Sequence, residues 1–246
     1  MTPARLVWTL VGATVLSEIA YPLSAGAVRD RLTVVTVAVF CAASVTHALV
    51  TRGPRTAAAL VVVTAGGGLA VEAVGTATGY PFGAYTYADS LGPHVLGVPW
   101  VIPAAWTMMA WPAWLAAGRL VRRPAARIAV AGWALASWDV FLDPQMVAAG
   151  HWTWERGDIP LTNYAAWLGV ALVMMAVLAP AARPSGVDVH SGPGDAPMYA
   201  VYLWTYASSV LAHAVFLGLP QSAAWGAVAM GPVAIPLAVT LWRARR

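Results

Sequence analysis

The sequence contains no lysine, and charged residues of both signs make up only 10% of its 246 residues, whereas soluble domains carry about 25%. All of its basic residues are arginines, which occur singly or in small clusters between apolar runs. No basic stripe interleaved with aromatic residues is present, so we expect no nucleic-acid partner. Hydrophobic residues reach 60% and the mean hydropathy is +0.69. This composition predicts an integral membrane protein that contacts lipid.

Cysteine and the usual metal-binding patterns are also scarce. Cys41 is the single cysteine and lies inside an apolar run, which excludes a disulfide framework and a thiolate metal cluster. The sequence has no His-x-x-x-His or Glu-x-x-His pair, no dinucleotide fingerprint and no Ser-His-Asp signature. We therefore expect no metal site and no cofactor.

Long apolar runs fill most of the chain. A membrane-spanning helix needs about 20 mostly apolar residues, and eight windows supply them: 6–27, 32–51, 56–78, 95–118, 126–148, 162–182, 198–219 and 222–242. The sequence thus predicts an all-α, polytopic membrane bundle of about eight transmembrane helices, forming one domain over residues 1–246 with no soluble domain. Residues 183–197 are rich in Gly, Pro, Ser and Asp, which is typical of a flexible linker, here on the cytoplasmic side.

The arginines predict the orientation of this bundle. With eight helices both termini share a side, and eleven of the fourteen arginines fall there; the other three are Arg29, Arg31 and Arg156. Basic residues concentrate in cytoplasmic loops, so we expect a multi-pass cell-membrane protein with both termini in the cytoplasm. We expect the first window to be retained rather than cleaved as a signal peptide, because Glu18 interrupts its apolar stretch.

Four acidic residues lie inside these windows. A charged side chain at bilayer depth costs roughly 2.5 to 3.5 kcal/mol and is usually kept where it faces a protein interior or a water cavity. Glu18 and Glu72 lie in the first and third windows, and Asp139 and Asp143 lie one helical turn apart in the fifth. One such acid often does no more than bond a neighbouring helix, but all four fall in the outer half of the bundle. This convergence favours a shared site.

Aromatic residues are abundant around that layer. Tyr87, Trp152 and Trp154 follow predicted helices and fit an interfacial aromatic belt. Trp106 and Trp138 are too deep for a belt and instead suit a pocket for a long apolar or cationic ligand.

We expect the histidines and glycines in the windows to serve packing and not chemistry. We expect His47 and His213 to be packing groups with satisfied hydrogen bonds. Glycines at 66, 67, 68 and 75 indicate close helix packing.

Two stretches carry a resemblance to a known family. The first runs from Gly83 through Tyr85 and Tyr87 to Leu91-Gly92, and continues as Gly97-Val98-Pro99-Trp100-Val101-Ile102-Pro103-Ala104-Ala105-Trp106. The second is Trp138-Asp139-Val140-Phe141-Leu142-Asp143-Pro144-Gln145-Met146-Val147, followed by Gly150, Trp152, Trp154, Ile159-Pro160-Leu161, Asn163 and Trp167. Both stretches resemble signatures of the carotenoid biosynthesis protein family. That family contains the carotenoid 1,2-hydratases, bisanhydrobacterioruberin hydratase among them.

The resemblance implies an enzyme that hydrates a carotenoid or another polyisoprenoid within the membrane, in association with other enzymes of carotenoid synthesis. Hydration of the terminal C1–C2 double bond requires a proton donor at C2 and a water that captures the cation at C1, and no cofactor. Asp139 is then the expected donor and Asp143 its partner, with Glu18 and Glu72 as competing donors. We expect both aspartates to share one cavity with at least one of Glu18 and Glu72, lined by Trp138 and by Tyr85 or Tyr87. The implied substrate-binding residues are Trp138, Trp106, Trp100, Tyr85, Tyr87, Trp152, Trp154, Asn163 and Trp167.

Two other functions remain open from the residues. A magnesium-dependent prenyl or lipid transferase would use Asp139 and Asp143 to hold the metal, but the outer loops offer only three arginines for a diphosphate. A proton-coupled carrier also uses buried carboxylates, although the chain shows no internal repeat.

Overall fold

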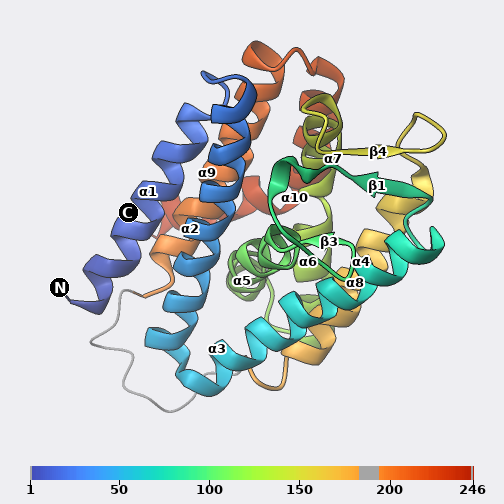
Figure 1. Cartoon of the computed structure of the whole chain (residues 1–246). Coiled ribbons are helices and arrows are strands. Elements are labelled where there is room, and N and C mark those ends of the chain that lie inside the picture. The colour runs from blue at the N-terminus through green and yellow to red at the C-terminus, as the bar shows by residue number, and fades with distance from the viewer. Residues whose placement is uncertain (1, 183–193, 245) are drawn as a thin grey trace.

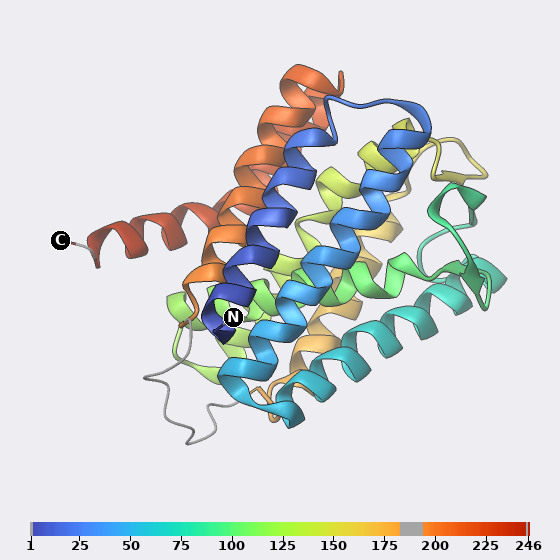
Figure 2. The ribbon, with the colours of Figure 1, turned by 60° about the vertical axis from the view of Figure 1, so that its left-hand side comes forward.

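The protein is a bundle of helices with two small two-stranded sheets at its edge (Figure 1). The computed structural model describes residues 2–182, 194–244 and 246. Helices α1 (Pro3–Ala20) and α2 (Gly26–Arg52) lie side by side in both views (Figure 2). Helix α1 begins in the usual way, because the Thr2 hydroxyl accepts from the Arg5 amide and Pro3 fills the first helical position.

The third and fifth windows each form a long helical rod with a local irregularity. Helix α3 (Pro54–Val61) passes through a π-helical turn (Val62–Gly66) into α4 (Gly67–Thr78). Helices α6 (Pro124–Ala136) and α7 (Asp139–Ala148) are separated by a break at Ser137 and Trp138. The break makes Asp139 the first residue of α7, which positions the second half of this rod independently of the first.

Helix α5 (Val101–Leu120) occupies the centre of the bundle. Every residue from 105 to 117 is buried, and α2, α6 and α9 (Ala196–Leu211) pack against it. Figure 1 looks nearly along its axis, and Figure 2 shows it crossing behind α2. A helix that is apolar and covered all round belongs to the core, so α5 is the element on which the other helices assemble.

The remaining helices complete the wall. Helix α8 (Leu161–Leu178) packs against α6, and α9 continues through a second π-helical turn (Ala212–Phe216) towards α10 (Pro220–Arg243). Helix α10 contains Pro232 and Pro236, and proline kinks a helix because it removes a hydrogen bond and clashes with the preceding turn. The C-terminal half of α10 accordingly extends away from the bundle (Figure 2).

The expectation of an all-α protein with helices in each of the eight windows is confirmed within the described residues. Five of the described helices are long and apolar enough to cross a membrane: Gly26–Arg52, Pro54–Thr78, Pro124–Ala148, Leu161–Leu178 and Pro220–Arg243. These five indicate a multi-pass membrane protein. The fourth window begins too early, since residues 95–100 belong to a loop.

The predicted linker between the sixth and seventh windows is described only at its end. Residues 183–193 lie outside the described part of the chain. Helix α9 already begins at Ala196, and Asp195 pairs with Arg52 of α2 at 2.8 Å. The last residues of that segment are therefore anchored to the bundle.

The loops at one end of the bundle form the sheets. Strand β1 (Tyr85–Tyr87) pairs antiparallel with β4 (Trp152–Trp154), and β2 (His94–Val95) pairs with β3 (Val98–Pro99). Successive side chains of a strand point to opposite faces. Thr86 and Thr153 are exposed on one face, whereas Tyr85, Trp152 and Trp154 are buried on the other, where β1 contacts α4 and β4 contacts α7.

Candidate functional site

Glu72 on α4 collects the donors that the sheet and the central helix direct at it. Its side chain is only 3% exposed. The hydroxyls of Tyr85 and Tyr87 donate to Oε2 at 2.5 and 2.8 Å, and the indole of Trp106 donates to Oε1 at 3.3 Å. Burial, and then the Glu72 carboxyl, raise the pKa of both tyrosines, so that their hydroxyls keep their protons and act as donors. Glu72 thus ties β1 and α5 to α4.

Two glycines make room for the rings around Glu72. Gly68 and Gly75 lie four residues before and three residues after Glu72, on the same face of the helix. A Cβ at Gly68 would lie 2.6 Å from the Trp106 ring, and one at Gly75 would lie 2.8 Å from the Tyr85 hydroxyl. The expectation of close packing is confirmed at these two positions, since any larger residue would displace a donor to Glu72.

Asp139 and Asp143 form a second group one turn apart on α7. Their side chains are 0% and 3% exposed and interact directly with each other. The amide of Asn163 on α8 donates to Oδ2 of Asp139 at 3.1 Å and also to Oδ2 of Asp143. Within the described residues the other oxygen of Asp139, Oδ1, has no hydrogen-bond partner. A buried carboxyl with a free oxygen is costly to a fold, which points to a chemical role.

These two groups meet at a small cavity of about 20 Å³, sufficient for one water molecule. Glu72 and Asp143 both line this cavity, which we call the cluster cavity. Its other lining residues are Phe82, Tyr85, Tyr87, Ile102, Ala105, Leu142, Trp152, Trp154, Asn163 and Trp167. Asp139 lies behind Asp143 and does not line it. We refer to Glu72, Asp139 and Asp143 as the carboxylate cluster.

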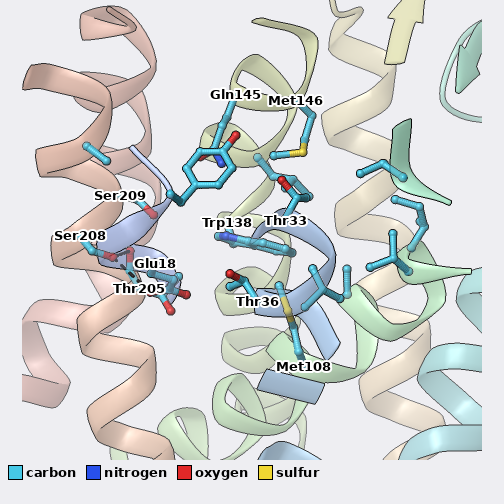
Figure 3. A pocket seen from close by; sticks show the side chains of 18 of the residues that line it. Glu18, Thr33, Thr36, Met108, Trp138, Gln145, Met146, Thr205, Ser208 and Ser209 are labelled. Atoms are coloured by element: carbon cyan, nitrogen blue, oxygen red, sulfur yellow. Dashed lines mark hydrogen bonds between the residues drawn. The ribbon is translucent and has the colours of Figure 1, made fainter. Parts of the chain in front are cut away.

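A larger chamber adjoins the cluster cavity. It measures about 120 Å³ and is enclosed by α1, α2, α5, α7 and α9 (Figure 3). Glu18 and Trp138 line it, and the chamber shares Ile102, Ala105, Leu142 and Trp152 with the cluster cavity. Trp152 of β4 therefore stands at the boundary between the two spaces.

The sequence-predicted site residues divide between these spaces. Glu72 and Asp143 line the cluster cavity together and Asp139 does not, so the expectation that both aspartates share one cavity with a glutamate is wrong for Asp139. The carboxylate cluster is surrounded by seven other predicted site residues: Tyr85, Tyr87, Trp106, Trp152, Trp154, Asn163 and Trp167. Trp106 stacks on Trp167 with ring centres 3.9 Å apart.

Three predicted residues lie elsewhere. Glu18 and Trp138 line the chamber rather than the cluster cavity, which corrects the expectation that Trp138 shares a cavity with the aspartates. The cause is the break before Asp139, since it turns Trp138 to the other side of the rod. Trp100 lines neither space: it is 40% exposed at the start of α5, close to Gly92.

Sequence reasoning missed the polar residues of the chamber. Ser208 on α9 donates to Oε2 of Glu18 at 3.4 Å. Gln145, which also lines the chamber, contacts Nε2 of His213 at 2.9 Å. Gln145 belongs to the second signature stretch, so the sequence did mark it, whereas a serine in an apolar window gives little signal.

His47 and His213 each have hydrogen-bond partners within the bundle. His47 accepts from the Trp111 indole at 2.9 Å and contacts the Gly194 carbonyl at 2.7 Å. His213 contacts Ser222 and Gln145. Both rings are satisfied packing groups, as expected. Among the residues that the structure describes, no three His, Cys, Asp or Glu side chains are grouped so as to hold a metal ion.

Comparisons with known proteins agree with this arrangement. Bisanhydrobacterioruberin hydratase of Haloarcula japonica is 36% identical over 106 residues, which are 40% of this chain and 36% of that protein. The match thus covers little more than a third of the relative's length. No solved structure matches the chain at a significant level. The sequence profile of a family described as "Carotenoid biosynthesis protein" matches residues 32–240. Because that match runs from α2 to α10 and includes the whole carboxylate cluster, the chain belongs to the carotenoid biosynthesis protein family.

Proposed function

We propose that the protein is a cofactor-independent carotenoid hydratase, which adds water across the terminal C1–C2 double bond of an acyclic carotenoid end. The observation that carries this proposal is the pair of contacting carboxyls, Asp139 and Asp143, placed beside a cavity that shares four lining residues with a larger chamber. Relationship to a protein named as a hydratase supports the same reaction.

The aspartate pair supplies an acid and a base together. Two carboxyl groups in contact within a buried site cannot both be ionised. They therefore share one proton. The protonated member transfers its proton to C2 of the alkene, and the π electrons of the double bond form the new C–H bond. The tertiary cation at C1 is captured by water, which then returns a proton to the pair. Each turnover consumes one water molecule and one double bond, and it restores the shared proton of the aspartate pair.

The geometry assigns the donor differently from the sequence. Asp143 lines the cluster cavity and Asp139 does not, so we propose Asp143 as the proton donor. Asp139, which does not face the cavity, would be the other carboxyl that shares this proton. Asn163 donates to both residues and would keep them in register through the reaction.

The surroundings suit a developing positive charge. Glu72 accepts three hydrogen bonds, and its carboxyl oxygens face the same cavity as Asp143. Trp152 borders both spaces, and a desolvated cation over an indole ring gains about 2 kcal/mol. If realised only in the transition state, that gain speeds the reaction more than tenfold.

Pigment analysis tests the proposal. The chain is expressed in a host that accumulates lycopene or a longer acyclic carotenoid, and we expect products heavier by one water, with the hydroxyl oxygen derived from labelled water. Asp143→Asn should lower conversion by about a hundredfold or more, since general acid catalysis contributes that much. Asp158→Asn, at an exposed position, is the matched control and should convert normally.

The same experiment distinguishes the other functions. A prenyl transferase would add a prenyl unit and stop in the presence of a chelator, and a carrier would leave the carotenoid unchanged. Full conversion by Asp143→Asn would contradict the assigned donor. Incorporation of label from molecular oxygen would contradict hydration itself.

A further inference from the structure

The chamber beside the cluster cavity is polar on one side. Figure 3 shows Glu18, Thr205, Ser208 and Ser209 gathered on the side formed by α1 and α9. Much of the remaining lining is apolar and includes Met108 and Trp138, with the side chains of Thr33 and Thr36 among them. A ligand that fits both sides must therefore combine an aliphatic body with a small polar group.

Glu18 is the strongest acceptor on the polar side. Ser208 donates to Glu18 at 3.4 Å, which is long for an O–H···O bond, and Trp204 of α9 is a second donor beside it. A carboxyl group has about four acceptor positions, so Glu18 retains capacity for a further donor from a ligand. Glu18 also lies outside the carboxylate cluster, which leaves it unused by the proposed hydration.

Gln145 of α7 is a further polar residue of the chamber, and contacts away from the chamber hold it in place. Gln145 contacts His213, and His213 contacts Ser222 on α10 at 2.9 Å. Ser222 in turn donates to the Val140 carbonyl of α7 at 3.0 Å. Gln145 is thereby fixed between α7, α9 and α10, as expected of a group that orients a ligand.

The size of the chamber limits the ligand. Its volume of about 120 Å³ is a little below that of an engineered cavity of about 150 Å³ that binds benzene, so it takes the end of a chain and not a whole carotenoid. Water alone would leave the apolar side without contacts, and apolar cavities tend to stay dry. A branched aliphatic end with one hydroxyl satisfies both sides, since burial of a hydroxyl is costly unless it finds a hydrogen-bond partner.

We propose that the Glu18 chamber binds the hydroxyl-bearing end of an isoprenoid chain, a tertiary alcohol, and that the Glu18 carboxyl accepts the hydrogen bond of that hydroxyl. The inference rests on the proposed function, because hydration at the cluster cavity creates such an end next to the shared wall of Ile102, Ala105, Leu142 and Trp152. The chamber would then hold the product end as it leaves the reacting position.

Binding of a matched pair of small probes tests this site directly. The full chain in lipid nanodiscs is titrated calorimetrically with 2,6-dimethylheptan-2-ol and with 2,2,6-trimethylheptane, in which a methyl replaces the hydroxyl, and empty nanodiscs give the blank. We expect the native protein to bind the alcohol about tenfold more tightly, as one hydrogen bond to a carboxylate provides. Equal binding of the two probes would overturn the proposal.

Variants identify the group responsible. Glu18→Leu should reduce the preference for the alcohol to less than about twofold, whereas Glu18→Gln, which keeps an acceptor carbonyl, should retain most of it. Thr162→Val, at an exposed position of α8 outside the chamber, is the control and should leave the preference intact. If Glu18→Leu keeps the native preference, the proposal fails, and Glu18→Ala, which also lacks an acceptor, replaces it in the test if the leucine variant does not fold.

Hydration assays separate this inference from the proposed function. Asp143→Asn should lose hydration and keep the preference for the alcohol, because Asp143 does not line the chamber. A native protein that prefers the alcohol but hydrates no carotenoid would contradict the proposed function and support the alcohol site. Loss of hydration in Glu18→Leu with an unchanged preference for the alcohol would make Glu18 a proton donor and overturn its role as an acceptor.

Discussion

Asn163 on α8 donates its amide to Asp143 on α7, and the same nitrogen reaches Asp139. One neutral side chain thus sets the relative position of two buried carboxyls. An amide cannot neutralise either charge, so its donation orients the pair without removing the proton that the pair shares.

Replacement of Asn163 should therefore affect both activity and stability. Asn163→Leu leaves two buried carboxyls without their donor, which typically costs about 1 to 3 kcal/mol, and we expect hydration to fall at least tenfold. Carotenoid conversion and the midpoint of thermal unfolding measure the two effects. Thr162→Val, at the exposed neighbouring position, should change neither, and normal conversion by Asn163→Leu would show that the aspartates need no such support.

The contact between Glu72 and Tyr85 should show energetic coupling. Tyr85→Phe removes the donor at 2.5 Å, and Glu72→Gln weakens the acceptor. Residues in one hydrogen-bond network typically couple by about 0.5 to 3 kcal/mol. The free energies of unfolding of both single variants and the double variant measure this coupling. Additive effects would indicate that the sheet is held over α4 by its ring packing alone.

The two glycines beside Glu72 should tolerate no side chain. Gly68→Ala and Gly75→Ala each place a Cβ within 3.0 Å of a ring atom or hydroxyl, and overpacking costs about 1 to 3 kcal/mol. We expect lower unfolding midpoints and reduced conversion for both. Gly169→Ala on α8 meets no atom within 4 Å and should be neutral or slightly stabilising; equal behaviour of all three variants would contradict the packing argument.

Chemical labelling tests the predicted orientation. Thr153 is exposed on β4, at the sheet end of the bundle. In a Cys41→Ser background, we expect Thr153→Cys to react with a membrane-impermeant thiol reagent in intact cells, and a reporter fused after Arg246 to be active only if it is a cytoplasmic marker. Labelling of Thr153→Cys only after permeabilisation would reverse the orientation.

The sequence predicted the helices well because hydropathy reports what a bilayer requires of each segment. It also predicted a shared cavity for the acidic residues, since buried charges need a common polar interior, and the structure shows this for Asp143 and Glu72. It did not predict which of them faces a cavity. That depends on the rotation of α7 after the break at Ser137 and Trp138, which packing against α8 and α10 sets.

The sequence also did not predict that the interior is divided into the cluster cavity and the chamber. The shared wall consists of Ile102, Ala105, Leu142 and Trp152, three of which are ordinary helix residues in an apolar run. Their position between Glu18 and Asp143 arises from contacts between segments far apart in the chain. Periodicity identifies the face of a helix but does not state what stands opposite it.

The burial of α5 has a consequence for how the protein is made. Helix α5 is not among the five described helices that are long and apolar enough to cross a bilayer, yet it is covered on all sides between residues 105 and 117. During synthesis α5 emerges before α6 and α9, which later enclose it. Until those helices arrive, α5 depends on α2 for shelter from lipid, so a ribosome that stops shortly after Leu120 should release a product that quality-control proteases remove.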